Sequence, residues 1–245
     1  TLTDMDRYFG NMEGFQAFSS AHLIPVIFYT ILTCIWIFLA KKWDYQRQYK
    51  SALYFSFVLA GLVLFWMFFK MWNNQFDPAE DFPFHLCNIL TLVLPFALYY
   101  KSRWFFGILY FWVLVGTMQA ILTPELKEPF PHFIYFRYWT VHCGLVMLIF
   151  YGLLVFKWKV YWKDIRNAII GANVYVVFSF IANYLSGGNY FFTMHKPRTA
   201  SLLDYLGPWP WYLFTGQIIM VLLFIGAYLP LHFNYRKYQK TNQTI

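Results

Sequence analysis

The stretch FHLCNILTLVLPFALYYKSRWFFGILYFWVLVGTMQAIL (residues 84–122) contains two long apolar runs that are separated only by Lys-Ser-Arg. Each run is close to the ~20 residues that an α-helix needs to cross a hydrocarbon layer of ~30 Å at ~1.5 Å per residue. Because the link is so short, the two helices must run antiparallel to each other. The stretch therefore predicts two neighbouring membrane-spanning helices.

The composition of the whole chain extends this prediction. The 245 residues are 60% hydrophobic and 12% charged, whereas about 25% charged residues is usual in soluble domains. Hydrocarbon offers no partner to an unpaired backbone group, which favours helices, and the apolar runs lack the alternation of a β-barrel. We expect an all-α polytopic membrane protein, a single domain over residues 1–245 with seven transmembrane helices. The expected spans are 22–40, 52–69, 84–100, 104–122, 133–156, 167–185 and 211–233.

The basic residues predict the orientation of these helices. The net charge is +8, and 13 of the 19 Lys and Arg residues follow the first, third, fifth and seventh runs. The positive-inside rule makes those links cytoplasmic, so the N-terminus lies outside and the C-terminus inside. Residues 1–21 are then an external N-terminal segment and 186–210 a long external loop. This topology accounts for the basic residues, and we expect no nucleic-acid partner.

Polar residues gather in the outer halves of the expected helices. Such residues normally face a bundle interior or a wet cavity, although Asn, Gln and His can also simply bridge helices. Arg137 enters the membrane by only one turn and can alternatively extend towards outer headgroups. We expect a substrate cavity at the outer side. Its candidate binding residues are His22, Asn88, Gln119, Arg137 and Asn183 within the spans, with Lys196 and Arg198 in the external loop.

Cys87 is the candidate nucleophile, because a thiol beside an imidazole can be activated to attack a carbonyl carbon. His85 is the nearest base in sequence, but two residues on a helix diverge by about 200° unless the helix starts after His85. His142, on another helix, is the better partner, although it lies ~12 Å below the outer end against ~5 Å for Cys87. The three cysteines show no CxxC spacing, and we expect no metal or cofactor.

Several motifs carry a family resemblance. FPFHLCNIL (82–90), GTMQAILTPEL (116–126), FPHF (130–133), His142, GGNYFFTMHKP (187–197) and SLLDYLGPWPWY (201–212) resemble those of YwaF-type bacterial integral membrane proteins. The broader family is similar to eukaryotic transmembrane protein 164, an acyltransferase that remodels ethanolamine phospholipids through a cysteine. Its cysteine motif resembles His85-Leu86-Cys87. The resemblance implies a seven-helix fold in a bacterial plasma membrane, and acyl transfer from phospholipids.

Three functions remain open at this stage. In the first, Cys87 accepts an acyl group from a phospholipid and passes it to another acceptor, with His142 or His85 as base. Asn88 and Gln119 then stabilise the oxyanion, and Arg137, Lys196 or Arg198 holds the phosphate. The second is a hydrolase at the same site, with water as acceptor. The third is a non-enzymatic transporter or binding protein for a small anion. The sequence leaves the oligomeric state open.

Overall fold

The computed structural model describes residues 8–10, 12–197 and 200–243, and the long segments among them are helical. Six helical segments are long and apolar enough to cross a membrane, together with one shorter apolar helix. The protein is therefore an all-α polytopic membrane protein, as predicted. The six segments are α2 (Ser20–Ala40), α3 (Tyr45–Trp72), the continuous segment Arg103–Leu122, α7 (Phe133–Leu154), α8 (Trp162–Ser186) and α9, whose apolar part is Trp211–Phe233 and which continues to Gln243.

The helix at the third predicted span, 84–100, is shorter than expected. Helix α4 comprises only Leu86–Tyr99, 14 residues, or ~21 Å at 1.5 Å per residue, which is short of a ~30 Å hydrocarbon layer. Pro83 disfavours a helical conformation at Phe82, and His85 is still extended (φ −69°, ψ 143°). The chain before α4 is held instead by Tyr190, whose hydroxyl accepts the Phe82 N–H at 3.1 Å.

The second span starts earlier than the predicted residue 52. Helix α3 begins at Tyr45, because the Asp44 carboxylate accepts the Arg47 N–H at 3.0 Å and caps the first turn. That hydrogen bond lowers the pKa of Asp44. Hydropathy alone missed these first turns because they carry polar and basic side chains.

The fourth span contains a π-helical turn. Helix α5 (Arg103–Phe111) passes into η1 (Trp112–Thr117), which is π-helical, and then into α6 (Met118–Leu122). A π turn contains an extra residue, so it rotates the side chains that follow it relative to a regular α-helix, and such turns are frequent at functional sites. The apolar run predicted the helix but not this turn.

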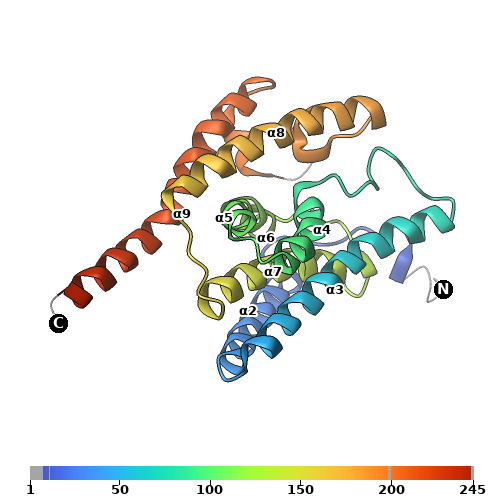
Figure 1. Ribbon diagram of the computed structural model, residues 1–245. Helices are drawn as coiled ribbons and strands as arrows, with labels where there is room; N and C mark the ends of the chain where they lie inside the picture. Colours follow the sequence, from blue (N-terminus) through green and yellow to red (C-terminus); the bar gives the residue numbers. More distant parts are fainter. Residues whose placement is uncertain (1–7, 11, 198–199, 244–245) are drawn as a thin grey trace.

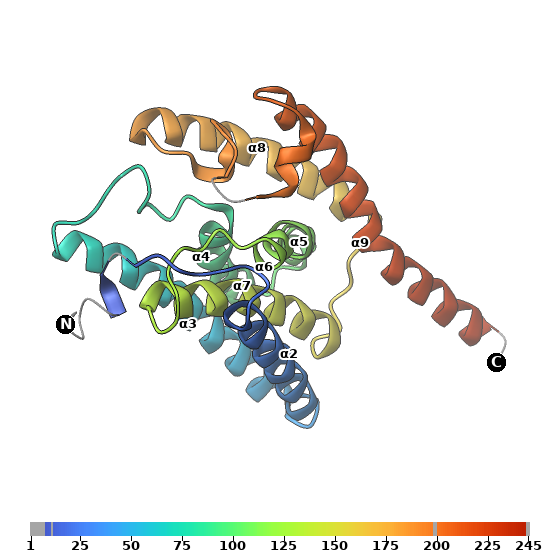
Figure 2. The same cartoon turned by 180° about the vertical axis from the view of Figure 1, so that it is seen from behind.

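The helices form three layers (Figures 1 and 2). Helices α8 and α9 lie on one side, α2, α3 and α7 on the other, and α4, α5 and α6 between them. The main core lies where α4, α5 and α7 meet, and its fully buried side chains include Leu90, Phe111, Leu145 and Ile149. An ion pair joins the α8–α9 layer to the middle layer: Arg103 of α5 donates to both oxygens of Asp164 on α8, at 2.7 and 2.9 Å.

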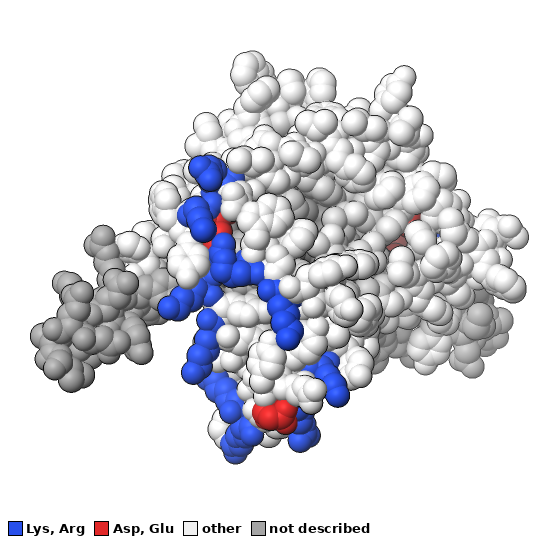
Figure 3. All heavy atoms as spheres, viewed as in Figure 1, with Lys and Arg blue, Asp and Glu red and all other residues white. Residues whose placement is uncertain are grey.

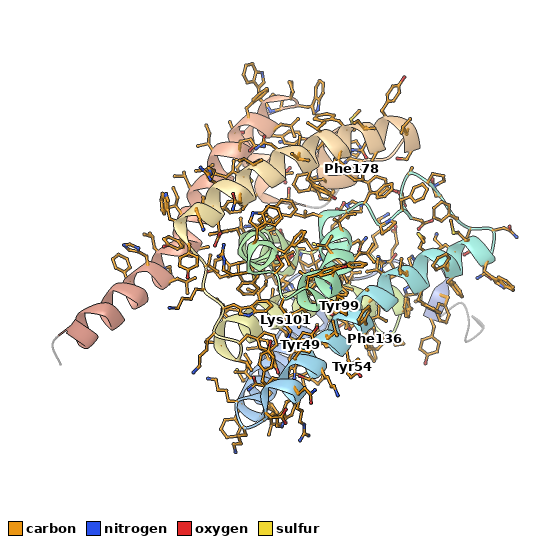
Figure 4. The ribbon with its side chains drawn as sticks, in the orientation of Figure 1. Tyr49, Tyr54, Tyr99, Lys101, Phe136 and Phe178 are labelled. Atoms are coloured by element: carbon orange, nitrogen blue, oxygen red, sulfur yellow. The ribbon has the colours of Figure 1, made fainter. Side chains whose placement is uncertain are left out.

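The basic links lie together at one end of the molecule, as Figure 3 shows. Two of them are in direct contact: Lys101 Nζ lies 4.7 Å from the centre of the Tyr49 ring, and the Tyr49 hydroxyl donates to the Tyr99 carbonyl at 3.3 Å (Figure 4). This arrangement is the one the predicted topology requires. The assignment of that end to the cytoplasm stays a prediction from the positive-inside rule.

The opposite end is closed by connections between helices. The backbone N–H groups of Gly14 and Phe15 both donate to the Lys127 carbonyl at 3.0 Å, so this part of the predicted N-terminal segment packs on the link before α7. The long loop contains two short 3-10 turns, η2 (Tyr190–Phe192) and η3 (Leu202–Leu206). These connections cover the end at which the polar residues were expected.

Candidate active site

A cavity of ≈ 550 Å³ lies between the α8–α9 layer and the middle layer. Its volume is in the range of small-molecule binding sites, ~300–1,000 Å³. Side chains from α4, η1, α6, α7, α8 and α9 and from the long loop line it. Six of the ten predicted site residues are on its wall: His85, Cys87, Asn88, Gln119, Arg137 and His142.

Cys87 lies in the first turn of α4, and its thiol contacts η1. The Sγ atom is 3.8 Å from the hydroxyl oxygen of Thr117, a fully buried residue at the end of the π turn. Gly116 permits this approach, because a Cβ there would lie 3.2 Å from the Leu86 side chain. Thr117 was not among the predicted site residues, since an isolated Thr in an apolar run carries no signal of its own.

His142 is held in one tautomer. Its Nδ1 is 2.7 Å from the Tyr138 carbonyl oxygen, and because a carbonyl only accepts, Nδ1 carries the proton in the neutral ring. The other nitrogen, Nε2, is then the acceptor. Tyr138 also packs against the imidazole, with ring centres 4.1 Å apart, and donates its hydroxyl to the Ala120 carbonyl at 2.7 Å. His142 therefore has the tautomer that a general base needs.

His85 is the residue immediately before α4, so the objection that helical rotation separates it from Cys87 does not apply. Its ring packs against Tyr190 and Phe192 of the long loop, with centres 5.2 and 5.7 Å apart. Tyr190 is itself held in place, because its hydroxyl donates to the Pro78 carbonyl at 2.7 Å. Burial raises the pKa of this hydroxyl to about 12, so it keeps the proton that it donates. His85 thus lies on the cavity wall under the loop, and the hydrogen-bonding contact of Cys87 is with Thr117 rather than with either histidine.

Arg137 is a cation with few partners. One Nη donates to the Asn88 side-chain oxygen at 3.3 Å, while Nε is buried without a hydrogen-bond partner. In the part of the chain that the structure describes, no carboxylate lies within ion-pair distance of it. Leaving such a donor buried and unpaired costs free energy. Since Arg137 lines the cavity, its environment suits an anionic ligand group.

Two predicted binding residues are structural instead. His22 is only 4% exposed; its Nδ1 accepts the Phe18 N–H at 3.0 Å, and its Nε2 donates to the Ile121 carbonyl at 2.9 Å. Asn183 is 2% exposed. Both its polar atoms bind the long loop, at Tyr190 and Thr193. Neither side chain has a polar atom free for a substrate, and neither lines the cavity.

Lys196 is not one of the residues that line the cavity. Its Nζ donates to the Asp204 carbonyl at 3.4 Å and lies 5.8 Å from the centre of the Tyr212 ring. Arg198 lies outside the described residues. Gln217 of α9, which was not among the predicted site residues, also lines the cavity.

Comparison with known proteins shows the family of the chain. The model of the TMEM164 family matches residues 17–228. A protein of Treponema pallidum (strain Nichols), described as "Uncharacterized protein", is 25% identical over 163 residues, which are 66% of this chain and 64% of that relative. The chain thus spans somewhat less than two thirds of the relative's length. No solved structure matches the chain. Because the family model covers most of the sequence, the protein belongs to the TMEM164 family.

Proposed function

We propose that the protein is a membrane-embedded acyltransferase that takes an acyl group from a phospholipid onto Cys87 and passes it to a second acceptor. The observation that carries this proposal is the cavity shared by a thiol, a histidine with an acceptor nitrogen and an arginine whose Nε has no hydrogen-bond partner. These are the groups that acyl transfer from an anionic lipid requires. The cavity lies between apolar helices that face lipid, and the substrate reaches it from a bacterial plasma membrane.

The first half-reaction forms a thioester. Nε2 of His142 takes the proton of the Cys87 thiol, and the sulfur attacks the ester carbonyl carbon of the phospholipid. The bond from this carbon to the glycerol oxygen then breaks. His142 returns the proton to that oxygen, and a lysophospholipid leaves. The thiol and Nε2 must approach each other for this transfer, which requires a rearrangement of side chains when substrate binds.

The second half-reaction releases the enzyme. His142 takes the proton of an acceptor hydroxyl or amine, whose oxygen or nitrogen attacks the thioester carbon. The C–S bond breaks, and the proton returns from His142 to the sulfur of Cys87. The two half-reactions balance: the donor has exchanged its acyl group for a proton, and the acceptor has exchanged a proton for the acyl group.

The remaining polar groups have roles that follow from their hydrogen-bonding capacity. Arg137 has an unpaired Nε and binds the phosphate of the donor. Asn88, which already accepts from Arg137, and Gln119 have amide N–H groups that can donate to the oxyanion. A transporter is the weaker alternative, because its polar path would have to continue past Trp112 and Phe224, at the end of the cavity away from these groups.

The experiment uses the purified protein in nanodiscs that contain a phospholipid with an isotope-labelled acyl chain and an unlabelled lysophospholipid acceptor. Mass spectrometry then detects the labelled acyl group on the Cys87 peptide and on the acceptor. We expect both signals to disappear in Cys87→Ala and to persist in Cys143→Ala, a matched control in which a buried cysteine of α7 is removed. His142→Gln should slow both half-reactions.

Two results would count against acyl transfer. Labelled free fatty acid without labelled acceptor would identify a hydrolase at the same site. Equal product formation by Cys87→Ala and the unmodified protein would remove Cys87 from the chemistry.

A further inference from the structure

The cavity has a second region beyond the polar groups, the apolar arm, defined by Trp112 and Val115 of η1, Ala172 and Val176 of α8, and Met220 and Phe224 of α9. The cavity-lining residues of α9 extend from Tyr212 to Phe224, which is ~18 Å along a helix. On this helix the last polar lining residue is Gln217, and the residues that follow it in the lining are apolar. The cavity is therefore polar towards the loops and apolar towards the membrane interior.

The polar atoms nearest the arm already have partners. The indole N–H of Trp112 donates to the Ala168 carbonyl at 2.9 Å, and the Tyr175 hydroxyl donates to the Phe84 carbonyl. A ligand in the arm thus meets only hydrocarbon and aromatic surface. A headgroup or another polar ligand would lose its hydrogen bonds there without replacement, so the arm suits an apolar chain.

The arm is closed at its inner end. The Phe111 and Phe224 rings lie 5.2 Å apart, and both side chains are almost completely buried. Trp112 packs so closely on α8 that a Cβ at Gly171 would lie 2.9 Å from its ring. The Tyr110 hydroxyl, donating to the Ala227 carbonyl at 2.7 Å, ties α5 to α9 just beyond. A chain that enters the arm therefore stops there and does not pass to the basic end.

Cys87 lies where the two regions meet. Its thiol contacts Thr117, the last residue of η1, while Trp112, the first residue of η1, lines the arm. Arg137 donates to the side chain of the residue after Cys87, Asn88, at 3.3 Å. A carbonyl carbon at the thiol is therefore close both to the arm and to Arg137. We infer that the apolar arm is the binding site of one long acyl chain, whose methyl end lies against Trp112 and Phe224 while the phosphate of the same lipid binds Arg137.

This inference deepens the proposed function and rests on it for the position of the carbonyl, but the arm can be tested without catalysis. The probe is a lysophosphatidylcholine with a diazirine at the methyl end of its acyl chain, photolysed with Cys87→Ala protein in phosphatidylcholine nanodiscs. We expect crosslinks to peptides that contain Trp112–Val115 and Met220–Phe224. A probe with the diazirine next to the carboxyl carbon should label α4 or α7 instead.

Two blocking substitutions test the assignment, each with a matched control on the same helix. Ala172→Trp and Met220→Trp fill the arm from opposite walls, and we expect each to abolish the methyl-end crosslinks. Val174→Trp and Leu222→Trp place the same side chain at positions that are 66% and 59% exposed on the outer surface, and labelling should persist in both. Thermal unfolding of each variant identifies any that fails to fold, and two independent positions keep the test decisive.

The outcomes separate the two proposals. Methyl-end crosslinks confined to outer positions such as Val174 and Leu222, or unchanged by both blocking substitutions, would overturn the acyl-chain site. If the crosslinks appear in the arm but no thioester forms on Cys87 in the unmodified protein, the chain site stands and acyl transfer fails.

Discussion

The ion pair between Arg103 and Asp164 provides a quantitative test of how α8 is attached to the rest of the protein. The Asp164 carboxylate is fully buried and accepts three hydrogen bonds, two from Arg103 at 2.7 and 2.9 Å and one from the Tyr161 N–H at 2.8 Å. It also packs against Gly107, where a Cβ would lie 2.6 Å from the Asp164 side chain. Asp164→Ala removes both acceptor oxygens, and with them all three hydrogen bonds, and leaves a gap beside α5.

The expected loss follows from these contacts. Removing one member of a buried ion pair costs ~3–5 kcal/mol because the other charge stays buried and unpaired. The Arg103 side chain is 34% exposed and recovers some hydration, which places the loss at the lower end, ~3 kcal/mol. For a chain of this size that corresponds to a decrease in Tm of about 6–12 °C.

The assay is thermal unfolding of the detergent-solubilised protein, followed by tryptophan fluorescence. Lys163→Ala is the matched control, because Lys163 is an exposed residue in the same first turn of α8 and should change Tm little. The double variant Arg103→Ala/Asp164→Ala should lose less than the sum of the two single variants, since it leaves no unpaired charge. A decrease in Asp164→Ala no larger than in Lys163→Ala would refute this account of the α5–α8 contact.

Two further predictions concern the site and its covering loop. Thr117→Val should slow maleimide alkylation of Cys87 about tenfold at fixed pH, because a hydrogen bond to a charged group such as the thiolate contributes ~1.5 kcal/mol. Thr117→Ser keeps the hydroxyl and should keep the alkylation rate. Equal rates in the two variants would show that the 3.8 Å contact does not stabilise the thiolate. Asn183→Ala should speed hydrogen exchange at the Tyr190 amide about fivefold, since it removes the 2.7 Å acceptor of that N–H and a hydrogen bond contributes ~1 kcal/mol. Tyr184→Ala, at an 85% exposed position nearby, should leave the exchange rate unchanged, and protection that survives in Asn183→Ala would mean that other contacts hold the loop.

The membrane class and most of the helices follow from the sequence by itself. Runs of about twenty apolar residues cannot be buried in a soluble protein of this size, and hydrocarbon permits only backbones that satisfy their own hydrogen bonds. The grouping of basic residues at one end also follows, because they lie in alternate links between the spans and successive spans cross the membrane in opposite directions. Boundaries were wrong where local contacts outweighed hydropathy, as at the Asp44 cap of α3 and the extended backbone that ends at His85.

The membership of the site was decided by tertiary structure. The outer position of a polar residue is visible in sequence, but its rotation about the helix axis is not. His22 and Asn183 therefore looked equivalent to Asn88 and Gln119, although the first two bind other segments of the protein and the second two line the cavity.

The π turn is the clearest feature of the site that tertiary structure decided and the sequence did not predict. It adds a residue to one turn of the fourth span, which brings Thr117 to Cys87 and Trp112 to the end of the apolar arm. Hydropathy does not distinguish a π turn from an α turn, since it depends on which residues are apolar and not on the number of residues in a turn. Only the packing of α4, α8 and α9 around this segment selects the turn, and with it the shape of the cavity.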